Sequence, residues 1–191
     1  SYIITLMKKI SCVMMVDYYH NYIKASLSIN SIYNHIYLLG TSKYKSFENE
    51  IPNMVSTGKG RTTCSYFLPN NNIIYASTHE FDHLCPETPL RVDGNYVWPI
   101  YSTYDIYEAD TNGNIIKKLT DNPGYDAEAT VSPKGDKIVF TSDRSGDLEL
   151  YTMNTDGSDV KQITFDLGYD GGAFFSPDGS KIIFRASRPI G

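Results

Sequence analysis

The sequence has little of what would mark a nucleic-acid-binding or membrane protein. Its 191 residues hold 17 Lys and Arg against 22 Asp and Glu, which gives a formal net charge of -5. Neither a basic stripe nor a Lys/Arg cluster is present, which argues against a general binder of nucleic acid or of anionic membranes. No apolar run approaches the roughly 20 residues that a membrane-spanning helix needs. We therefore expect no nucleic-acid partner and no membrane insertion.

Catalytic and nucleotide-binding motifs are also missing. No Gly-x-Ser-x-Gly elbow occurs, so nothing predicts a serine hydrolase within these residues. Residues 57–62 partly match the sequence pattern of a phosphate-binding loop, but Lys59 is followed by Gly60 rather than by Ser or Thr. Because this stretch also precedes a predicted strand rather than a helix, it is interpreted as a turn. The expected protein is not an enzyme and carries no cofactor.

Glycine and proline are scarce in residues 1–53, where each occurs once beside seven tyrosines. The composition changes near Asn53, which predicts a boundary between an N-terminal segment of unassigned structure and a second unit. The apolar run at residues 10–16 follows Lys8 and Lys9, yet it is short and has no small-x-small cleavage site. We expect residues 1–53 to be an irregular or poorly packed lead segment without a convincing signal peptide.

The second unit repeats itself with a period of 44 residues. Gly124-Tyr125-Asp126 returns as Gly168-Tyr169-Asp170, and the same offset relates 132–135 to 176–179 and Arg144 to Arg188. A fixed period in the 40s, with short strands and turn residues at set positions, is typical of the four-stranded blades of β-propellers. The sequence therefore predicts an all-β fold of partial propeller blades.

One repeat unit is predicted to contain four antiparallel strands, at 127–131, 137–141, 148–153 and 160–164. Asp156-Gly157 predicts a two-residue hairpin between the last two strands. A degenerate earlier unit has strands at 62–67, 73–76, 104–109 and 115–119, with about 20 extra residues between His79 and Thr103. The expected blades are 54–120, 121–164 and an incomplete 165–191.

Strand order predicts which loops share a face. In an antiparallel blade the loop between strands two and three emerges beside the loop that leads from strand four to the next blade. We expect this face to bind a partner if the protein binds one. The residues expected there are Tyr125, Asp126, Arg144, Tyr169 and Asp170, with Tyr96 and Trp98 from the insertion.

The repeated carboxylates are interpreted as structural. Asp126 with Glu128, and Asp170 on the equivalent turn, suggest paired acids for acid-base chemistry. A residue that recurs in each unit more often serves the unit, here by accepting hydrogen bonds from turn amides. Arg144 and Arg188 are expected to brace neighbouring turns.

The insertion contains His79, Asp82 and His83 as weak candidates for metal ligands, because His and carboxylate groups in a short loop can converge on zinc. Their spacing fits no established motif, so we predict no metal site. Cys64 and Cys85 are expected to lie close together and to form a disulfide, and the alternative is two buried thiols. Cys12 would remain unpaired.

The pattern Ala-x-x-Ser-Pro-x-Gly-x-x-Ile-x-Phe at residues 129–140, with Asp156-Gly157 and Ile163-Thr164, resembles the WD40-like (PD40) repeats of TolB-type propellers. The resemblance covers about residues 54–189. It implies a six-bladed, generally extracytoplasmic propeller, often periplasmic, that acts as a protein-binding scaffold. The same repeats also occur as non-catalytic propellers attached to prolyl-oligopeptidase-like serine peptidases, which is the alternative function.

Three units are fewer than the six that close such a ring. An open propeller exposes a blade face and unpaired strand edges, which favour pairing with another chain. We therefore expect a fragment of a larger bacterial protein, with protein partners and possible self-association through the open blade edges.

Overall fold

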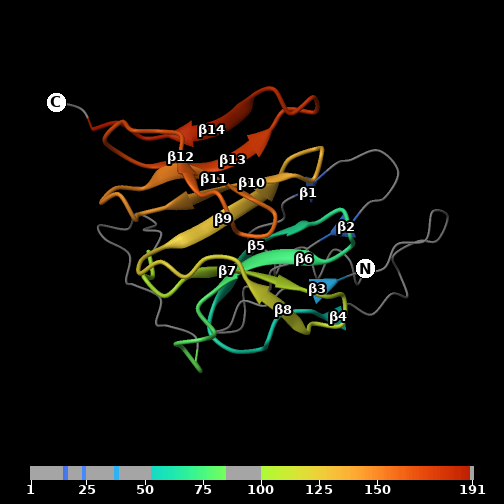
Figure 1. The fold of residues 1–191 in the computed structure, drawn as a ribbon. Helices are drawn as coiled ribbons and strands as arrows, with labels where there is room; N and C mark the ends of the chain where they lie inside the picture. The colour runs from blue at the N-terminus through green and yellow to red at the C-terminus, as the bar shows by residue number, and fades with distance from the viewer. Residues whose placement is uncertain (1–14, 17–22, 25–36, 39–52, 85–99, 190–191) are drawn as a thin grey trace, which may run out of the picture.

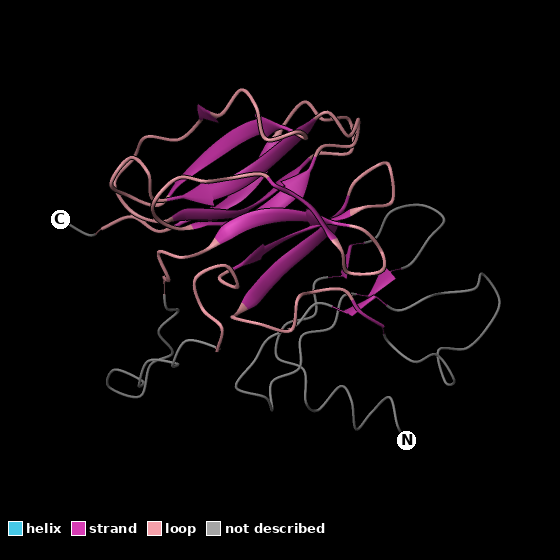
Figure 2. Cartoon of the chain, turned by 60° about the horizontal axis from the view of Figure 1, so that its bottom comes forward, coloured by secondary structure: helices cyan, strands magenta, loops and turns pink. Residues whose placement is uncertain are grey.

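The computed structural model describes residues 15–16, 23–24, 37–38, 53–84 and 100–189. These residues form strands and loops with no helix among them (Figure 2). Accordingly, the described part of the chain has no helix long and apolar enough to cross a membrane. The expected all-β class is confirmed.

Two four-stranded antiparallel sheets form the centre of the structure (Figure 1). Blade 1 consists of β5 (Thr62–Phe67), β6 (Ile73–Ser77), β7 (Asp105–Ala109) and β8 (Ile115–Lys118). Blade 2 consists of β9 (Asp126–Val131), β10 (Lys137–Ser142), β11 (Glu149–Asn154) and β12 (Lys161–Gln162). In each sheet the strands pair in sequence order, as expected of propeller blades.

Blade 3 is represented by β13 (Asp170–Phe175) and β14 (Ile182–Ala186), which pair with each other. Four two-residue strands precede blade 1: β1 (Met15–Val16) pairs with β2 (Ile23–Lys24), and β3 (Tyr37–Leu38) pairs with β4 (Asn53–Met54). Figure 1 shows the three blades stacked one after another, with β14 at the far side of the stack from β4.

The first strand of each blade contains a residue with positive φ. Cys64, Glu128 and Gly172 have φ values of 47°, 59° and 61°, and each lies where the pairing register with the second strand shifts. Such a bulge bends the strand and changes the direction of its side chains. The repetition shows that the bulge belongs to the blade design, although two of the three residues have a Cβ that disfavours this backbone conformation.

The turn between the first two strands repeats as well. In blade 2 the amide of Gly135 donates to the carbonyl of Ser132, and in blade 3 Gly179 donates to Ser176 in the same way. Both glycines have positive φ, at 70° and 72°. In blade 1 the equivalent position is Asn71, with φ 66°, because asparagine tolerates this region better than most residues with a side chain.

The hairpin between the last two strands differs from the prediction. The amide of Gly157 donates to Asn154, and the amide of Asn154 donates to Ser158, so three residues rather than two connect the strands. Gly157 has positive φ (86°), whereas Asp156 does not. The two-residue prediction is wrong because Asp-Gly also suits a type I turn followed by a glycine bulge, which needs positive φ at the glycine alone.

The main core lies between blades 1 and 2. Ile138 and Phe140 on β10 are fully buried and cluster with Ile74 and Ile106 of blade 1. A second cluster joins Val139 and Leu150 of blade 2 to Ala173 on β13, with contributions from Phe175 and Ile182. Because alternate residues of a strand point to opposite faces, blade 2 packs on blades 1 and 3 through alternate positions of β10.

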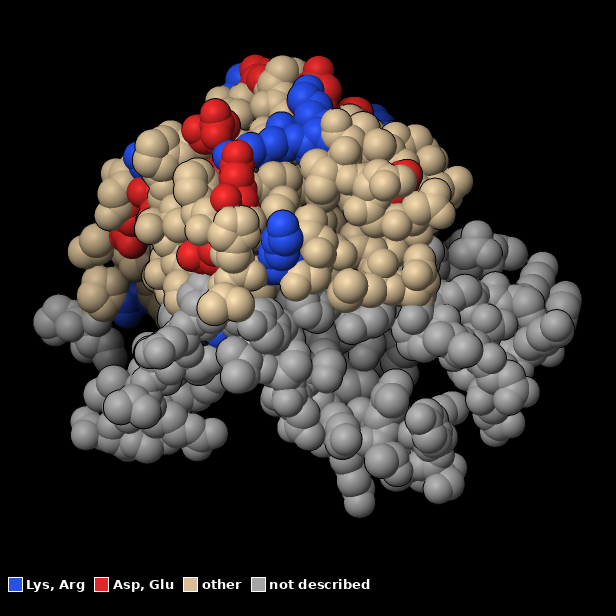
Figure 3. Space-filling model, turned by 90° about the horizontal axis from the view of Figure 1, so that it is seen from below, with Lys and Arg blue, Asp and Glu red and all other residues tan. Residues whose placement is uncertain are grey.

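Side chains of both charges lie side by side on the face seen in Figure 3. Lys and Arg lie among Asp and Glu there, and most of the described surface is neutral. A polyanion-binding surface would instead show a continuous basic stripe.

Candidate functional site

The loops that the strand order assigns to one face run from β6 to β7, from β10 to β11, and from the last strand of each blade to the next (Figure 1). The recurring charged residues lie at the base of these loops. The contacts of these residues show whether this face is suited to catalysis or to binding a partner.

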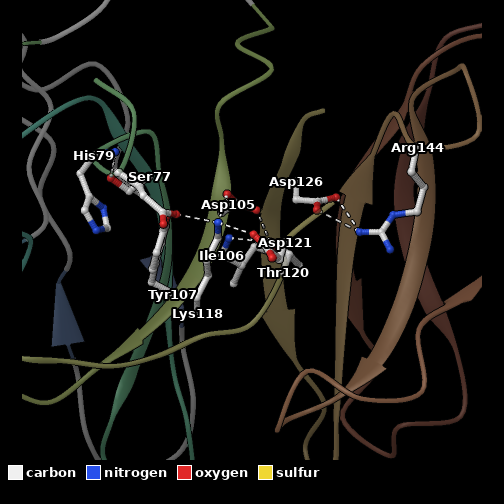
Figure 4. Close-up of polar contacts among 11 residues, drawn as sticks. Ser77, His79, Asp105, Ile106, Tyr107, Lys118, Thr120, Asp121, Asp126 and Arg144 are labelled. Carbon is white, nitrogen blue, oxygen red and sulfur yellow. Dashed lines mark hydrogen bonds and ion pairs between the residues drawn. The ribbon is translucent and has the colours of Figure 1, made fainter. Parts of the chain in front are cut away.

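An arginine and an aspartate form the recurring ion pair of this face. In blade 2, Nη2 of Arg144 lies 2.9 Å from both carboxylate oxygens of Asp126 (Figure 4). The Nε of Arg144 donates to the hydroxyl of Ser142. In blade 3, Nη1 and Nη2 of Arg188 donate to the two oxygens of Asp170 at 2.6 and 3.1 Å. Both aspartates are fully buried.

This pair corrects one prediction. Asp126 and Asp170 were expected to accept hydrogen bonds from turn amides, and the structure instead gives each carboxylate an arginine partner. The carboxylates that accept from the turn amides are those of Asp143, which takes the amide of Tyr125 at 2.7 Å, and Asp147, which takes the amide of Gly168 at 2.6 Å. The arginines hold the ends of the first and second strands of one blade together, which agrees with the expectation that they brace neighbouring turns.

A lysine-centred network lies beside this pair, in blade 1 (Figure 4). Nζ of Lys118 lies 2.6 Å from Glu80, 2.9 Å from Asp105 and 2.7 Å from Asp121. The hydroxyl of Thr120 donates to Asp105 at 3.1 Å. Every charged group of the network has a partner, which is typical of a structural arrangement.

Burial dominates the protonation equilibria of the two inner carboxylates. It raises the pKa of Asp126 even though Ser142 and Arg144 hydrogen-bond to its ionised form. It also raises the pKa of Asp105, against the hydrogen bond from Lys118. For Lys118, burial acts to lower the pKa, but the hydrogen bonds to Asp121 and Glu80 outweigh it, and the pKa is raised.

Blade 1 has other residue types at the positions of the ion pair. Thr62 stands at the position of Asp126, and His79 at the position of Arg144, because the amides of His79 and Arg144 both donate to a serine at the end of the second strand. The imidazole of His79 lies 4.3 Å from the ring of Tyr107, and burial lowers its pKa. His79 is thus explained by its place in the blade.

The remaining metal candidates do not converge with His79. Asp82 accepts a hydrogen bond from the hydroxyl of Thr103 at 2.9 Å, which holds the start of the insertion to its end. Within the residues that the structure describes, including His83, no three His, Cys, Asp or Glu side chains are grouped to hold a metal ion. The candidates Cys85, Tyr96 and Trp98, together with Cys12, lie outside the described residues, and so does the predicted disulfide of Cys64.

The two tyrosines expected on the binding face have different surroundings. Tyr125 is 2% exposed and stacks edge-on against Tyr104, with ring centroids 5.6 Å apart, so its side chain belongs to the core. Tyr169 is half-buried, and its hydroxyl donates to Glu128 at 2.8 Å. With Asp126 and Asp170 buried as well, the exposed part of this face is formed by other residues.

Glu128 connects blades 2 and 3, a role that the sequence analysis did not find. Its carboxylate accepts hydrogen bonds from the hydroxyls of Tyr169 and Thr141 and from the amide of Gly172 at 2.8 Å. The bulge at Glu128 directs this side chain toward the next blade. The 44-residue repeat gave no signal for it, because the same position holds Cys64 in blade 1 and Gly172 in blade 3.

The exposed residues of the loop face include large apolar side chains. Phe81 and Leu84, in the loop after β6, are 62% and 71% exposed, and Phe165 and Leu167, in the loop after β12, are 75% and 71% exposed. Strand order places both loops on the same face. Exposed apolar side chains gathered on one face are more typical of protein contact surfaces than of catalytic sites.

Comparison with known proteins finds a family model that matches the repeats. Residues 100–189 match the model described as the TolB beta propeller domain, PD40. These residues are thus similar to TolB-type propeller repeats. The blade arrangement and the 44-residue period agree with this similarity.

Solved structures show the same fold. TolB from Agrobacterium tumefaciens superposes on 87% of this chain and 50% of its own, with a TM-score of 0.58 and 23% identity. TolB from Acinetobacter baumannii covers 85% of this chain and 34% of its own, with a TM-score of 0.59 and 24% identity. The tricorn protease covers 91% of this chain and 15% of its own, with a TM-score of 0.56 and 16% identity. This chain therefore spans half or less of the length of these proteins.

No curated protein sequence matches the chain. The similarity to TolB-type repeats therefore rests on the repeat model, and the structural likeness adds the fold.

Proposed function

We propose that this TolB-type segment is a non-enzymatic, extracytoplasmic scaffold that binds a protein partner on its loop face. The observation that carries the proposal is that the recurring charged residues of this face are paired, whereas large apolar side chains are exposed there. The recurring aspartates and arginines form the ion pairs Asp126–Arg144 and Asp170–Arg188, whereas Phe165 is 75% exposed. A buried, paired carboxylate is poorly placed for proton transfer, and an exposed aromatic side chain is a common anchor in protein interfaces.

The test is partner capture by the immobilised chain from an extract of bacterial envelope proteins. We expect the unaltered chain to retain a protein that the double variant Phe165→Ser, Leu167→Ser loses. Ile116→Ser is the matched control, because Ile116 is 56% exposed but lies on the outer strand β8 rather than on the loop face. Equal capture by all three proteins would contradict the assignment of the face.

An assay for peptide and ester hydrolysis addresses the competing role. The part of the tricorn protease that is similar to this chain is 15% of its length, which supports an accessory propeller of a peptidase as the second candidate. We expect no hydrolysis above background. Reproducible hydrolysis by the purified chain would overturn the non-enzymatic assignment.

A further inference from the structure

The third strands of blades 1 and 2 each begin with an acid, and the two acids occupy equivalent places. Asp105 is the first residue of β7, and Glu149 is the first residue of β11. The residue after each acid donates its amide to a threonine hydroxyl, to that of Thr120 at 2.9 Å and to that of Thr164 at 2.8 Å. The surroundings of the two carboxylates can therefore be compared position by position.

In blade 1 the acid has an ammonium partner from the same blade. Nζ of Lys118 lies 2.9 Å from the carboxylate of Asp105, and the hydroxyl of Thr120 adds a hydrogen bond at 3.1 Å (Figure 4). The same Nζ lies 5.5 Å from the centroid of the Phe81 ring. One lysine head group thus contacts both a carboxylate and an aromatic ring, which attract a cation by its charge.

Blade 2 has the acid without the lysine. In the register of blade 1, Lys118 lies opposite Tyr107. In the register of blade 2, Gln162 lies opposite Tyr151 and so stands where Lys118 does. The side-chain nitrogen of Gln162 donates to the carbonyl of Thr164 at 2.8 Å. Gln162 cannot supply the ammonium group that Lys118 supplies in blade 1.

The carboxylate of Glu149 is buried and has an unpaired oxygen. Glu149 is 3% exposed, and its Oε2 has no hydrogen-bond partner among the residues that the structure describes. The two arginines of the loop face have other acids: Arg144 donates to Asp126. Arg188 donates to Asp170. Because a buried carboxylate oxygen without a partner costs free energy, this position favours a cation that comes from elsewhere.

We propose that the carboxylate of Glu149 binds the ammonium group of one lysine side chain of the protein partner. This inference rests on the proposed function, because it places the lysine on the same loop face, and it adds the chemistry of the partner. Lys118 is the template, since its head group contacts the equivalent acid of blade 1. The partner segment would carry a lysine next to apolar residues that contact Phe165 and Leu167.

The loops around the start of β11 leave room for such a side chain. Ser145 and Gly146, in the loop before β11, are exposed, and a Cβ added to Gly146 would meet no atom within 4 Å. Phe165 directly follows Thr164 and is 75% exposed. The stem of a lysine packs on apolar surface while its ammonium group reaches an acid, so Phe165 is placed to contact the stem.

The available ligands favour an ammonium group over a divalent metal ion. Of the residues that the structure describes, no three His, Cys, Asp or Glu side chains are grouped to hold a metal. Ca²⁺ takes about six to eight oxygen ligands, whereas one carboxylate forms a charge-assisted hydrogen bond with an ammonium group. A lysine therefore matches what Glu149 offers.

The probe is n-butylammonium, which has the stem and the head group of a lysine side chain. Titration of the whole chain, followed by proton–nitrogen NMR, should give saturable shifts of the amides at the start of β11. Glu149→Gln keeps the shape of the side chain and removes its charge, so it should weaken binding about tenfold. Equal binding to the two proteins, or binding to neither, would overturn the proposal.

Two control titrations define the ligand. The neutral analogue n-butanol should not cause these shifts, because it lacks the charge that Glu149 is proposed to bind. Potassium chloride controls for ionic strength and should also leave the amides unchanged. Shifts of the same size with n-butanol would make the contact apolar, and with potassium chloride would assign it to an inorganic cation. Either result would overturn the proposal.

Substitutions at Gln162 test the template. Gln162→Lys supplies the ammonium group from the chain itself, as Lys118 does in blade 1, and should abolish binding of n-butylammonium. Gln162→Met is the matched control, because it also loses the hydrogen bond to Thr164 but adds no charge. It should leave binding unchanged. Loss of binding in both variants, or in neither, would contradict the template and overturn the proposal.

Partner capture separates this inference from the proposed function. From the same envelope extract, immobilised Glu149→Gln should retain about tenfold less of the protein that the unaltered chain captures. Equal capture by the two would keep the loop face as the binding surface and overturn the lysine contact. No capture by the unaltered chain would overturn the proposed function, whereas n-butylammonium binding would still identify the ammonium site at Glu149.

Discussion

At the scale of single residues, burial and pairing explain why the recurring acids are structural. Asp126 is fully buried, and removing a carboxylate from water costs free energy unless charged and hydrogen-bonding partners compensate. Arg144 provides such compensation from a side chain that is 18% exposed. In blade 1, Thr62 stands in place of the aspartate, so no buried carboxylate requires a cation at the position of His79.

Arg144→Met tests this dependence. The substitution leaves the Asp126 carboxylate buried without its cation, and we expect a loss of about 3 kcal/mol in the free energy of unfolding. Urea unfolding followed by circular dichroism measures it. Arg188→Met is the matched control with a smaller expected effect, because the side chain of Arg188 is 38% exposed. Equal losses for the two variants would show that burial of the pair does not determine its contribution.

The turn acid Asp178 gives a prediction about pH. Hydrogen bonds from the hydroxyl of Ser176 and from the amide and hydroxyl of Ser180 lower its pKa to about 2. Because the folded-state pKa is depressed, its contribution to stability is present above about pH 4 and is lost as the pH falls through about 2. Carbon-13 NMR titration of the carboxyl should give a midpoint near pH 2, and Ser180→Ala should raise it. A midpoint near pH 4 in the unaltered chain would contradict the turn geometry.

The repeat allowed the residues of the ion pair to be found from the sequence, but not their partners. Asp126 and Arg144 recur together as Asp170 and Arg188, which marks them as structural. Their contact could not be predicted, because it depends on how the first and second strands end side by side. Glu128 was harder still, since its position changes identity from blade to blade and its backbone has a positive φ that glutamate seldom adopts.

At the scale of elements, the turns were predicted better than the strand ends. Ser-Pro-x-Gly specifies a turn because proline fixes one φ and glycine permits another, and the structure has this turn in blades 2 and 3. The strand expected at 160–164 is reduced to β12 (Lys161–Gln162), with two residues paired to β11. An outer strand pairs with one neighbour only, so its length depends on few hydrogen bonds. The hydrophobic pattern of the sequence therefore predicts a longer strand than the one that forms.

Gly135→Ala tests the importance of the first turn. Its φ of 70° strains any residue with a Cβ, and an added Cβ would also overlap the ring of Pro69 in the turn of blade 1. We expect a loss of about 2 to 3 kcal/mol in the free energy of unfolding. Gly146→Ala is the control, because its φ is also positive, at 97°, but no atom lies within 4 Å of the added Cβ. Thermal unfolding should show a clearly larger decrease for Gly135→Ala.

At the scale of the whole molecule, stability depends on contacts between successive blades. The cluster of Val139 and Leu150 with Ala173 is an apolar contact between blades 2 and 3. Polar contacts add to it, among them the hydrogen bonds to the carboxylate of Glu128 and the one from the hydroxyl of Thr130 to the carbonyl of Ala173. In a repeat protein each unit contacts mainly its neighbours, so the loss of one interface acts on the unit beyond it. Blade 3, with two paired strands, depends most on this interface.

Glu128→Ala should therefore weaken the attachment of blade 3 while leaving blade 1 unchanged. The alanine keeps the bulge position occupied by a residue with a Cβ but removes the acceptor for Tyr169 and Gly172. We expect faster hydrogen exchange of the β13 and β14 amides, by about tenfold, because losing these bonds costs about 1 to 3 kcal/mol. Glu108→Ala is the matched control, since Glu108 is also half-buried and accepts two side-chain hydrogen bonds, both from within blade 1. Equal acceleration in blades 1 and 3, or none in either, would show that Glu128 does not couple the blades.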